Sequence, residues 1–300
     1  STAGGEGIRR AYELAEANLI KDGVNSVILA TDGDFNVGIT DSEQLEDFVA
    51  RKRESGVTLT VLGFGQGNYN DAMMQTLAQA GNGNAAYIDN LNEARKVLVD
   101  EMAGTVFTIA GDVKFQIEFN PSCVAEYRLI GYETRMLETA DFNNDKVDAG
   151  DIGAGHRVTA LYEVTPVGSD ARLTDPLRYG KPEGAASADC SEIAYLKMRY
   201  KLPGETASKL IERPITSADR STLDRLNGDF KFAASVAGFA QLLRGDPYLK
   251  DFSYGRVIEL AQAGKGADPF GYRAEFINLV RLAENSASLT PLSMNGNGGE

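Results

Sequence analysis

The segment Thr31-Asp32-Gly33-Asp34 is the first in the chain whose residue types and position suit binding chemistry. It follows the apolar run Ser26–Ala30, which predicts a fully buried strand. Open α/β sheets bind ligands at the carboxyl ends of their strands, and a carboxylate beside a flexible glycine suits a hard cation such as Mg²⁺. We therefore expect a cation site at Asp32. The alternative is that Asp32 and Asp34 only cap or solvate a loop.

A second acidic segment, residues 141–151, matches part of a calcium-binding loop. Its first three ligand positions hold oxygen-bearing side chains, and two further aspartates follow. Lys146 replaces the usual glycine of the turn, and Ile152 stands where a bidentate glutamate is expected. The candidate ligands are Asp141, Asn143, Asp145, Asp148 and Asp151. The alternative is an acidic hairpin loop whose Asn and Asp side chains bond their own backbone.

The other reactive side chains argue against an enzyme. His156 is the only histidine, which excludes histidine-rich zinc sites. No partner nucleophile is visible for it, so we expect His156 to start a strand as a structural residue. The run Gly63–Gly67 lacks the Lys-Ser/Thr pair of a phosphate-binding loop. A carboxylate-metal hydrolase built on residues 141–151 is the remaining enzymatic alternative. Cys123 and Cys190 are too few for a disulfide framework, so free thiols are favoured and a single bridge stays open.

The overall charge restricts the partners. The 300 residues include 43 acidic and 30 basic side chains, a formal net charge of −13. Such a surface repels nucleic acid and anionic lipid, so neither is an expected partner, whereas it suits divalent cations. No run approaches the roughly 20 apolar residues that a membrane-spanning helix needs.

The elements that position these residues fall into four segments. Residues 1–104 alternate between helical patterns and short apolar strands, which predicts a Rossmann-like parallel α/β sheet. Residues 105–220 alternate polar and apolar side chains without a long helix, which predicts an antiparallel β-sandwich. Residues 221–287 return to helical spacing, with one apolar stripe from Leu226 to Leu243 expected in the core, and 288–300 form a polar tail.

The first segment is similar to the second half of a von Willebrand factor type A domain. The resemblance rests on Ser1–Ile8, the helix after it, Ser26–Gly33 and the strand at Val57–Gly65. In that family a threonine loop and the aspartate of a strand-ending Thr-Asp-Gly complete a metal-ion-dependent adhesion site. The resemblance gives those roles to Thr2 and Asp32, with Mg²⁺, or else Ca²⁺ or Mn²⁺, bridging to an acidic side chain of a protein ligand.

One family motif is missing. The family's Asp-x-Ser-x-Ser motif, which begins the metal site, does not occur in this chain. Thr2 and Asp32 alone offer too few oxygens for a six-coordinate ion, so we expect this chain by itself to bind metal weakly. The family's first strand pairs with the strand equivalent to Ser26–Ala30, which we therefore expect to show an unpaired apolar edge. The resemblance implies that the missing half exists in the gene product.

The later segments resemble a bacterial subgroup in which such a domain precedes a module of unknown function. Residues 127–133, 141–156 and 200–204 are similar to that module. Members of this subgroup are often predicted envelope lipoproteins, which implies an extracytoplasmic location. The resemblance thus implies a divalent-cation-dependent, adhesion-type binding module of the bacterial envelope. The alternative function is an accessory or assembly factor acting with an AAA-type ATPase.

Overall fold

The computed structural model describes residues 4–21, 23–32, 42–65, 70–101, 104, 107–132, 136–175, 190–249 and 252–288. The chain divides into two compact units. The first consists of residues 1–116, 137–157 and 197–212, and the second of residues 117–136, 158–196 and 213–300. This division differs from the expected boundaries at 104 and 220, because three of its boundaries, at 116/117, 196/197 and 212/213, fall within strands.

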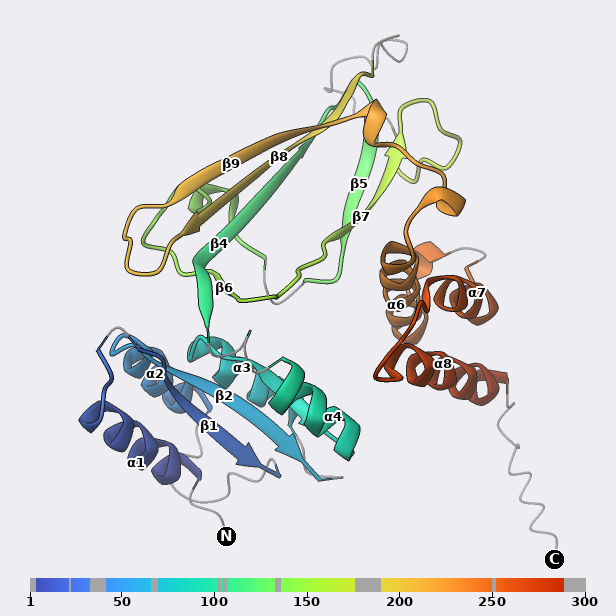
Figure 1. The fold of residues 1–300 in the computed structure, drawn as a ribbon. Coiled ribbons are helices and arrows are strands. Elements are labelled where there is room, and N and C mark those ends of the chain that lie inside the picture. Colours follow the sequence, from blue (N-terminus) through green and yellow to red (C-terminus); the bar gives the residue numbers. More distant parts are fainter. Residues whose placement is uncertain are drawn as a thin grey trace, which may run out of the picture. The chain divides into compact units, whose positions relative to one another are not determined.

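Three neighbouring parallel strands form the sheet of the first unit (Figure 1). They are β1 (Asn25–Thr31), β2 (Val57–Phe64) and β3 (Ala85–Ile88), in the spatial order β1-β2-β3. The helices of this unit are α1 (Gly4–Ala17), α2 (Ser42–Arg53), α3 (Asp71–Ala80) and α4 (Leu91–Arg95), the last continued by the π-helical segment η1 (Lys96–Asp100). The predicted alternation of helices and parallel strands is confirmed.

The core of the sheet is built from β2 and three helices. Val57, Leu59 and Val61 of β2 are fully buried, and one buried cluster joins them to side chains of α1, α2 and α3. The helical members are Ile8, Tyr12, Leu45, Val49, Met74, Leu77 and Ala78. Because β2 is the central strand, its apolar run is buried along almost its whole length, as a parallel sheet requires.

Strand β1 is less buried than its sequence predicts. Val27 and Leu29 pack against the core, whereas Ser26, Ile28 and Ala30 on the opposite face are exposed, Ile28 by 48%. Among the described residues β1 pairs only with β2, so its other edge has no neighbouring strand. The expectation of a fully buried strand was wrong, and the expectation of an apolar edge strand is confirmed for the part of the chain that is described.

In the segment that follows, β4 pairs with β6 and β5 pairs with β7, and both pairs are antiparallel. One sheet has the order β6-β4-β8-β9 and the other pairs β5 with β7. The strands are β4 (Thr108–Phe119), β5 (Val124–Ile130), β6 (Gly150–Gly153), β7 (Leu161–Pro166), β8 (Glu192–Lys201) and β9 (Lys209–Thr216). Strands β6 and β9 lack the regular alternation of polar and apolar residues that predicts a strand. His156 lies in the loop after β6 instead of starting a strand, and its Nδ1 accepts a hydrogen bond from the Gly153 amide.

A disulfide joins Cys123 to Cys190, so the preference for free thiols was wrong. The two Cα atoms lie 5.6 Å apart, within the usual range for a disulfide. The residues are 67 positions apart in the sequence, and spacing alone does not show that strands β5 and β8 start side by side.

Three helices close the described chain: α6 (Gly228–Arg244), α7 (Tyr254–Gly264) and α8 (Tyr272–Ser288). Short 3-10 turns occur at Thr139–Asp141, Ser217–Asp219, Leu223–Arg225 and Pro247–Leu249. No helix of the described residues is long and apolar enough to span a bilayer. Residues 289–300 of the predicted tail lie outside the described part.

The predicted core stripe of α6 needs correction. Phe230 and Leu243 are 44% and 61% exposed, whereas the buried residues of this helix are Ser235, Gly238 and Gln241. A Cβ at Gly238 would lie 2.3 Å from a ring carbon of Phe252, so only a glycine permits this approach. The buried positions of this helix are small or polar, and a count of large apolar side chains overlooks them.

Candidate functional site

Asp32 directly follows β1, at the carboxyl edge of the parallel sheet, and is exposed. Its Cβ lies 3.8 Å from the position that a Cβ of Gly65 would take, just after the end of the neighbouring strand β2. Gly65 has a φ of +88°, a conformation that side chains disfavour, and its carbonyl accepts a hydrogen bond from the Tyr87 hydroxyl of β3. The ends of β1 and β2 therefore lie close together beside this carboxylate, and a side-chain hydrogen bond ties β3 to the end of β2.

The described residues do not complete a cation site at this edge. Among them, no three His, Cys, Asp or Glu side chains lie close enough together to hold a metal ion. Asp32 supplies one carboxylate, whereas Mg²⁺ takes six ligands, so the site as described does not fit the ion without further oxygens. Thr2 and Asp34 lie outside the described residues, and the predicted pairing of Thr2 with Asp32 stays a prediction.

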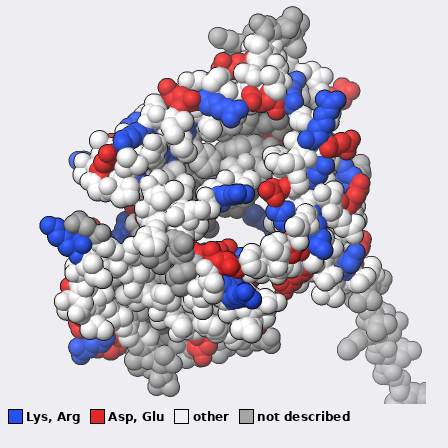
Figure 2. All heavy atoms as spheres, in the orientation of Figure 1, with Lys and Arg blue, Asp and Glu red and all other residues white. Residues whose placement is uncertain are grey.

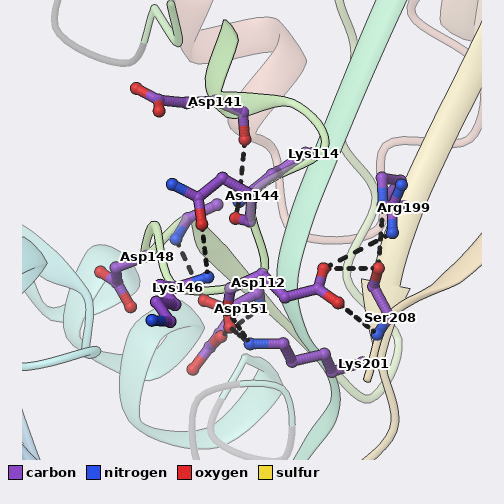
Figure 3. A network of polar contacts seen from close by, with 12 residues as sticks. Asp112, Lys114, Asp141, Asn144, Lys146, Asp148, Asp151, Arg199, Lys201 and Ser208 are labelled. Atoms are coloured by element: carbon purple, nitrogen blue, oxygen red, sulfur yellow. Dashed lines mark hydrogen bonds and ion pairs between the residues drawn. The ribbon is translucent and has the colours of Figure 1, made fainter. Parts of the chain in front are cut away.

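The acidic segment 141–151 is held by basic side chains of the first unit (Figure 3). Lys114 of β4 is only 5% exposed, and its Nζ donates to the backbone carbonyls of Asp141 and Asn144 at 3.3 and 2.6 Å. The polar face of β4 is therefore partly buried here. The carbonyls neutralise none of the charge, but they replace hydrogen bonds that the ammonium group loses to burial.

Arg199 of β8 and Ser208, the residue just before β9, hold the middle of the segment. The Arg199 guanidinium donates to Asn143 Oδ1 at 2.9 Å, and Ser208 Oγ donates to Asp145 Oδ1 at 2.7 Å. Hydrogen bonds from the Ser208 hydroxyl and amide, together with the nearby Arg199 and Lys201 charges, lower the pKa of the Asp145 carboxyl. Asp145 is thus held as an anion by donors of the protein itself.

The end of the segment contains two carboxyls whose pKa is raised. Burial is the main cause for both Asp148 and Asp151, and the neighbouring Asp112 carboxylate adds to it. Asp148 accepts from Arg53 of α2 at 2.7 Å, and Asp151 Oδ1 accepts from the Asp112 amide at 3.2 Å. Asp112 in turn accepts from Lys201 and from the Ala149 amide.

The side chains of the predicted calcium loop therefore do not converge on one point. Asn143, Asp145, Asp148 and Asp151 each accept a hydrogen bond from a protein donor, and Asp141 offers its carbonyl to Lys114. These contacts favour the plain acidic loop, and calcium binding stays a prediction. Sequence reasoning missed the donors. One signal was present, because Lys197, Arg199 and Lys201 alternate along β8 and so lie on one face of it.

Acidic and basic side chains are interspersed over the face of the molecule seen in Figure 2. The net charge of −13 is therefore not gathered there into one acidic surface, and many of the acidic side chains are paired.

The fold and this edge define a mixed α/β protein in which an open parallel sheet precedes antiparallel strands and a helical end. The chain belongs to the family described as "Uncharacterized protein YfbK, C-terminal", which matches residues 104–286, more than half of its length. This match confirms the expectation that a module of unknown function follows the parallel sheet.

Two sequences and one solved structure are similar to this chain. The uncharacterized protein YfbK of Escherichia coli (strain K12) is 49% identical over 291 residues, covering 97% of this chain and 50% of that protein. The chain thus spans about half the length of this curated relative. Inter-alpha-trypsin inhibitor heavy chain H3 of Mesocricetus auratus is 28% identical over 183 residues, covering 56% of this chain and 20% of that protein. A solved structure of a von Willebrand factor type A protein from Catenulispora acidiphila is 16% identical, covers 94% of this chain and 63% of its own, and has a TM-score of 0.41.

Proposed function

We propose that this chain is part of a protein-binding module that contacts its ligand at the carboxyl edge of the parallel sheet, and that it is not an enzyme. The observation that supports this most directly is the exposed Asp32 at the end of β1. The end of β2 lies beside it, and the hydrogen bond from Tyr87 to Gly65 ties β3 to that end. An exposed carboxylate on a rigid strand end suits recognition, because binding does not have to order it first.

The proposal includes a divalent cation, Mg²⁺ in the first place, with Ca²⁺ and Mn²⁺ as alternatives. Asp32 would be one ligand and Thr2 a second, and an acidic side chain of the partner protein would complete the contact. Since the described residues leave the ion short of oxygens, the remaining ligands would come from residues outside the described part. Cation dependence is therefore tested separately from the position of the binding edge.

The test is calorimetric titration of Mg²⁺ into the complete gene product and, alongside, into this 300-residue chain. We expect heat of binding in the complete product and little or none in the chain alone. Asp32→Ala should abolish that heat. Glu54→Ala is the matched control, because Glu54 is an exposed carboxylate of the same unit that lies before the amino end of β2, away from the carboxyl ends of the strands.

The outcomes separate the two candidate sites. Unchanged heat in Asp32→Ala would exclude the sheet edge as the cation site. Equal Ca²⁺ binding by both proteins, abolished by Asp145→Asn and not by Asp32→Ala, would assign the ion to the acidic segment 141–151. If neither protein binds Mg²⁺, Ca²⁺ or Mn²⁺, the cation part of the proposal is wrong. Binding of a partner protein at the sheet edge then has to be measured without a metal ion.

We also propose an envelope location for the module. The disulfide between Cys123 and Cys190 supports it, because such bonds persist in oxidising compartments and are rare in the cytosol of mesophiles. Fractionation of cells that express the complete gene product tests this, and recovery in the cytosolic fraction alone would contradict it.

A further inference from the structure

The strands of the second unit bury little apolar surface. Among their described residues, the buried apolar side chains are Val124 of β5 and Ala194 of β8, together with Cys123 just before β5. Nearby apolar residues are exposed, for example Tyr127 by 60% and Val158 by 58%. The parallel sheet, by contrast, has a cluster of ten buried residues. A region with so small a core needs another source of stability.

The disulfide lies at the centre of this small core. Cys123 is 3% exposed and is adjacent to Val124, while Cys190 lies two residues before β8. Around it, the Asn120 amide donates to the Ile193 carbonyl at 2.9 Å, and the Val167 amide donates to the Cys123 carbonyl at 3.0 Å. The ends of β4 and β7 and the starts of β5 and β8 therefore meet at this bond.

Further hydrogen bonds hold the residues next to Cys190. Asn120 Nδ2 donates to the Glu192 carbonyl at 2.8 Å, and the Ser217 amide, just after β9, donates to the Ser191 carbonyl at 2.8 Å. Both carbonyl groups lie within two residues of Cys190. A change in the position of Cys190 would therefore disturb the hydrogen bonds that join the start of β8 to the ends of β4 and β9.

We propose that the Cys123–Cys190 disulfide is a redox-sensitive crosslink that stabilises the strands of the second unit against unfolding. It closes a loop of 67 residues, and such a crosslink stabilises the folded state mainly by restricting the unfolded chain. The proposal is independent of the cation site and of the binding function.

The corresponding redox step is thiol–disulfide exchange with a dithiol. A thiolate of the dithiol attacks one sulfur of the bond, which gives a mixed disulfide and one free cysteine thiolate of this chain. The second thiol of the reagent then displaces the other cysteine. Two electrons pass from the dithiol to the protein, the reagent becomes a disulfide, and Cys123 and Cys190 become thiols. The strand ends around Cys123 and Cys190 are then held by hydrogen bonds alone, without a covalent link, and open more readily.

The test measures thermal unfolding of the full chain, oxidised and after incubation with dithiothreitol. We expect reduction to lower the Tm by roughly 5–15 °C, given the usual size of a disulfide's contribution and the length of the chain. The double variant Cys123→Ala/Cys190→Ala should have the lower Tm in both conditions, which excludes a general effect of the reagent.

Hydrogen exchange locates the change. Amides of β5 and β8 should lose protection on reduction, whereas those of β2 in the parallel sheet should not. This measurement on the wild-type chain decides the question even if the double variant does not fold. Equal Tm and equal exchange in the oxidised and reduced chain, or two titratable thiols in protein isolated without reductant, would overturn the proposal.

Discussion

At the scale of single residues, Arg128 links a strand of the second unit to the end of a helix in the same unit. This arginine of β5 donates to Asp246 Oδ2 and to Glu163 Oε2, both at 2.7 Å, and its guanidinium lies 4.7 Å from the ring centre of Tyr248. Asp246 follows α6, whereas Glu163 is on β7. A single side chain thus connects the β5–β7 pair to the end of a helix.

The Arg128–Asp246 contact predicts a pH dependence of stability. The hydrogen bond from Arg128 is the main reason that the pKa of Asp246 is lowered. A carboxyl with a lower pKa in the folded chain stabilises it fully above the unfolded value of about 4, and this contribution is lost as the pH falls through the folded pKa. We expect Asp246→Asn to lower the free energy of unfolding by about 1–2 kcal/mol at pH 7 and by much less near pH 3.

Denaturant titrations of both proteins between pH 3 and pH 7 measure this difference. Glu163→Gln is the control, since Glu163 contacts the same arginine but its side chain is 50% exposed, so its effect should be smaller. A constant difference between wild type and Asp246→Asn across this pH range would rule out the assigned role.

At the scale of elements, two glycines of the first unit have opposite surroundings. A Cβ at Gly83, before β3, would lie 2.0 Å from the carbonyl oxygen of Leu59 on β2. At Gly7, within α1, a Cβ would meet nothing within 4 Å. Gly83 allows two backbone segments to approach closely. Gly7 has no such role, and it only gives the unfolded chain more conformational freedom than an alanine would.

The two alanine variants should therefore change stability in opposite directions. We expect Gly83→Ala to destabilise the chain by about 2 kcal/mol or more, because the backbone has to move. Gly7→Ala should stabilise it by about 0.5–1 kcal/mol through helix propensity. Chemical denaturation of both variants tests this, and a neutral Gly83→Ala would show that β3 can shift away from β2 at little cost.

Sequence patterns predict the buried elements of this chain better than the exposed ones. Strand β2 and its flanking helices follow the expected periodicity because they surround a large core. Strand β9 does not, since most of its residues are exposed and Pro214 interrupts the pattern of a strand. Strand β6 is only four residues long and contains two glycines.

The candidate sites show the same limit. The position of Asp32 at a strand end could be predicted, because the apolar run Ser26–Ala30 fixes where β1 ends. The partners of the acidic segment could not, since Lys114 and Arg199 lie 27 and 56 residues from the groups they bond. The pairing of Cys123 with Cys190 likewise depends on tertiary structure and has no local signal.

At the scale of the whole molecule, the open edge of β1 predicts self-association. In the described residues its outer edge has no neighbouring strand, and Ile28 on its uncovered face is 48% exposed. Unpaired apolar edges pair with other chains, and charged residues prevent this. We expect this 300-residue chain to associate with rising concentration, and Ile28→Lys to reduce the association.

Light scattering at 0.15 M salt measures the effect, because repulsion between the acidic chains is then largely screened. Leu282→Lys is the matched control, since Leu282 is an apolar residue of α8 that is 65% exposed and far from β1 in sequence. An equal reduction by both variants would mean that general solubility, and not the strand edge, sets the association.

The order of strands in the second sheet also affects how the chain is made. Strands β1, β2 and β3 are neighbours both in sequence and in space, so the parallel sheet can form once residue 88 has left the ribosome. Strand β4 ends at Phe119, but its neighbour β8 begins only at Glu192. Throughout this part of synthesis one side of β4 has no strand to pair with. A messenger truncated between these two points would release a product in which β1, β2 and β3 are paired while β4 still lacks its neighbour β8, and such an open strand is a target for chaperones and proteases.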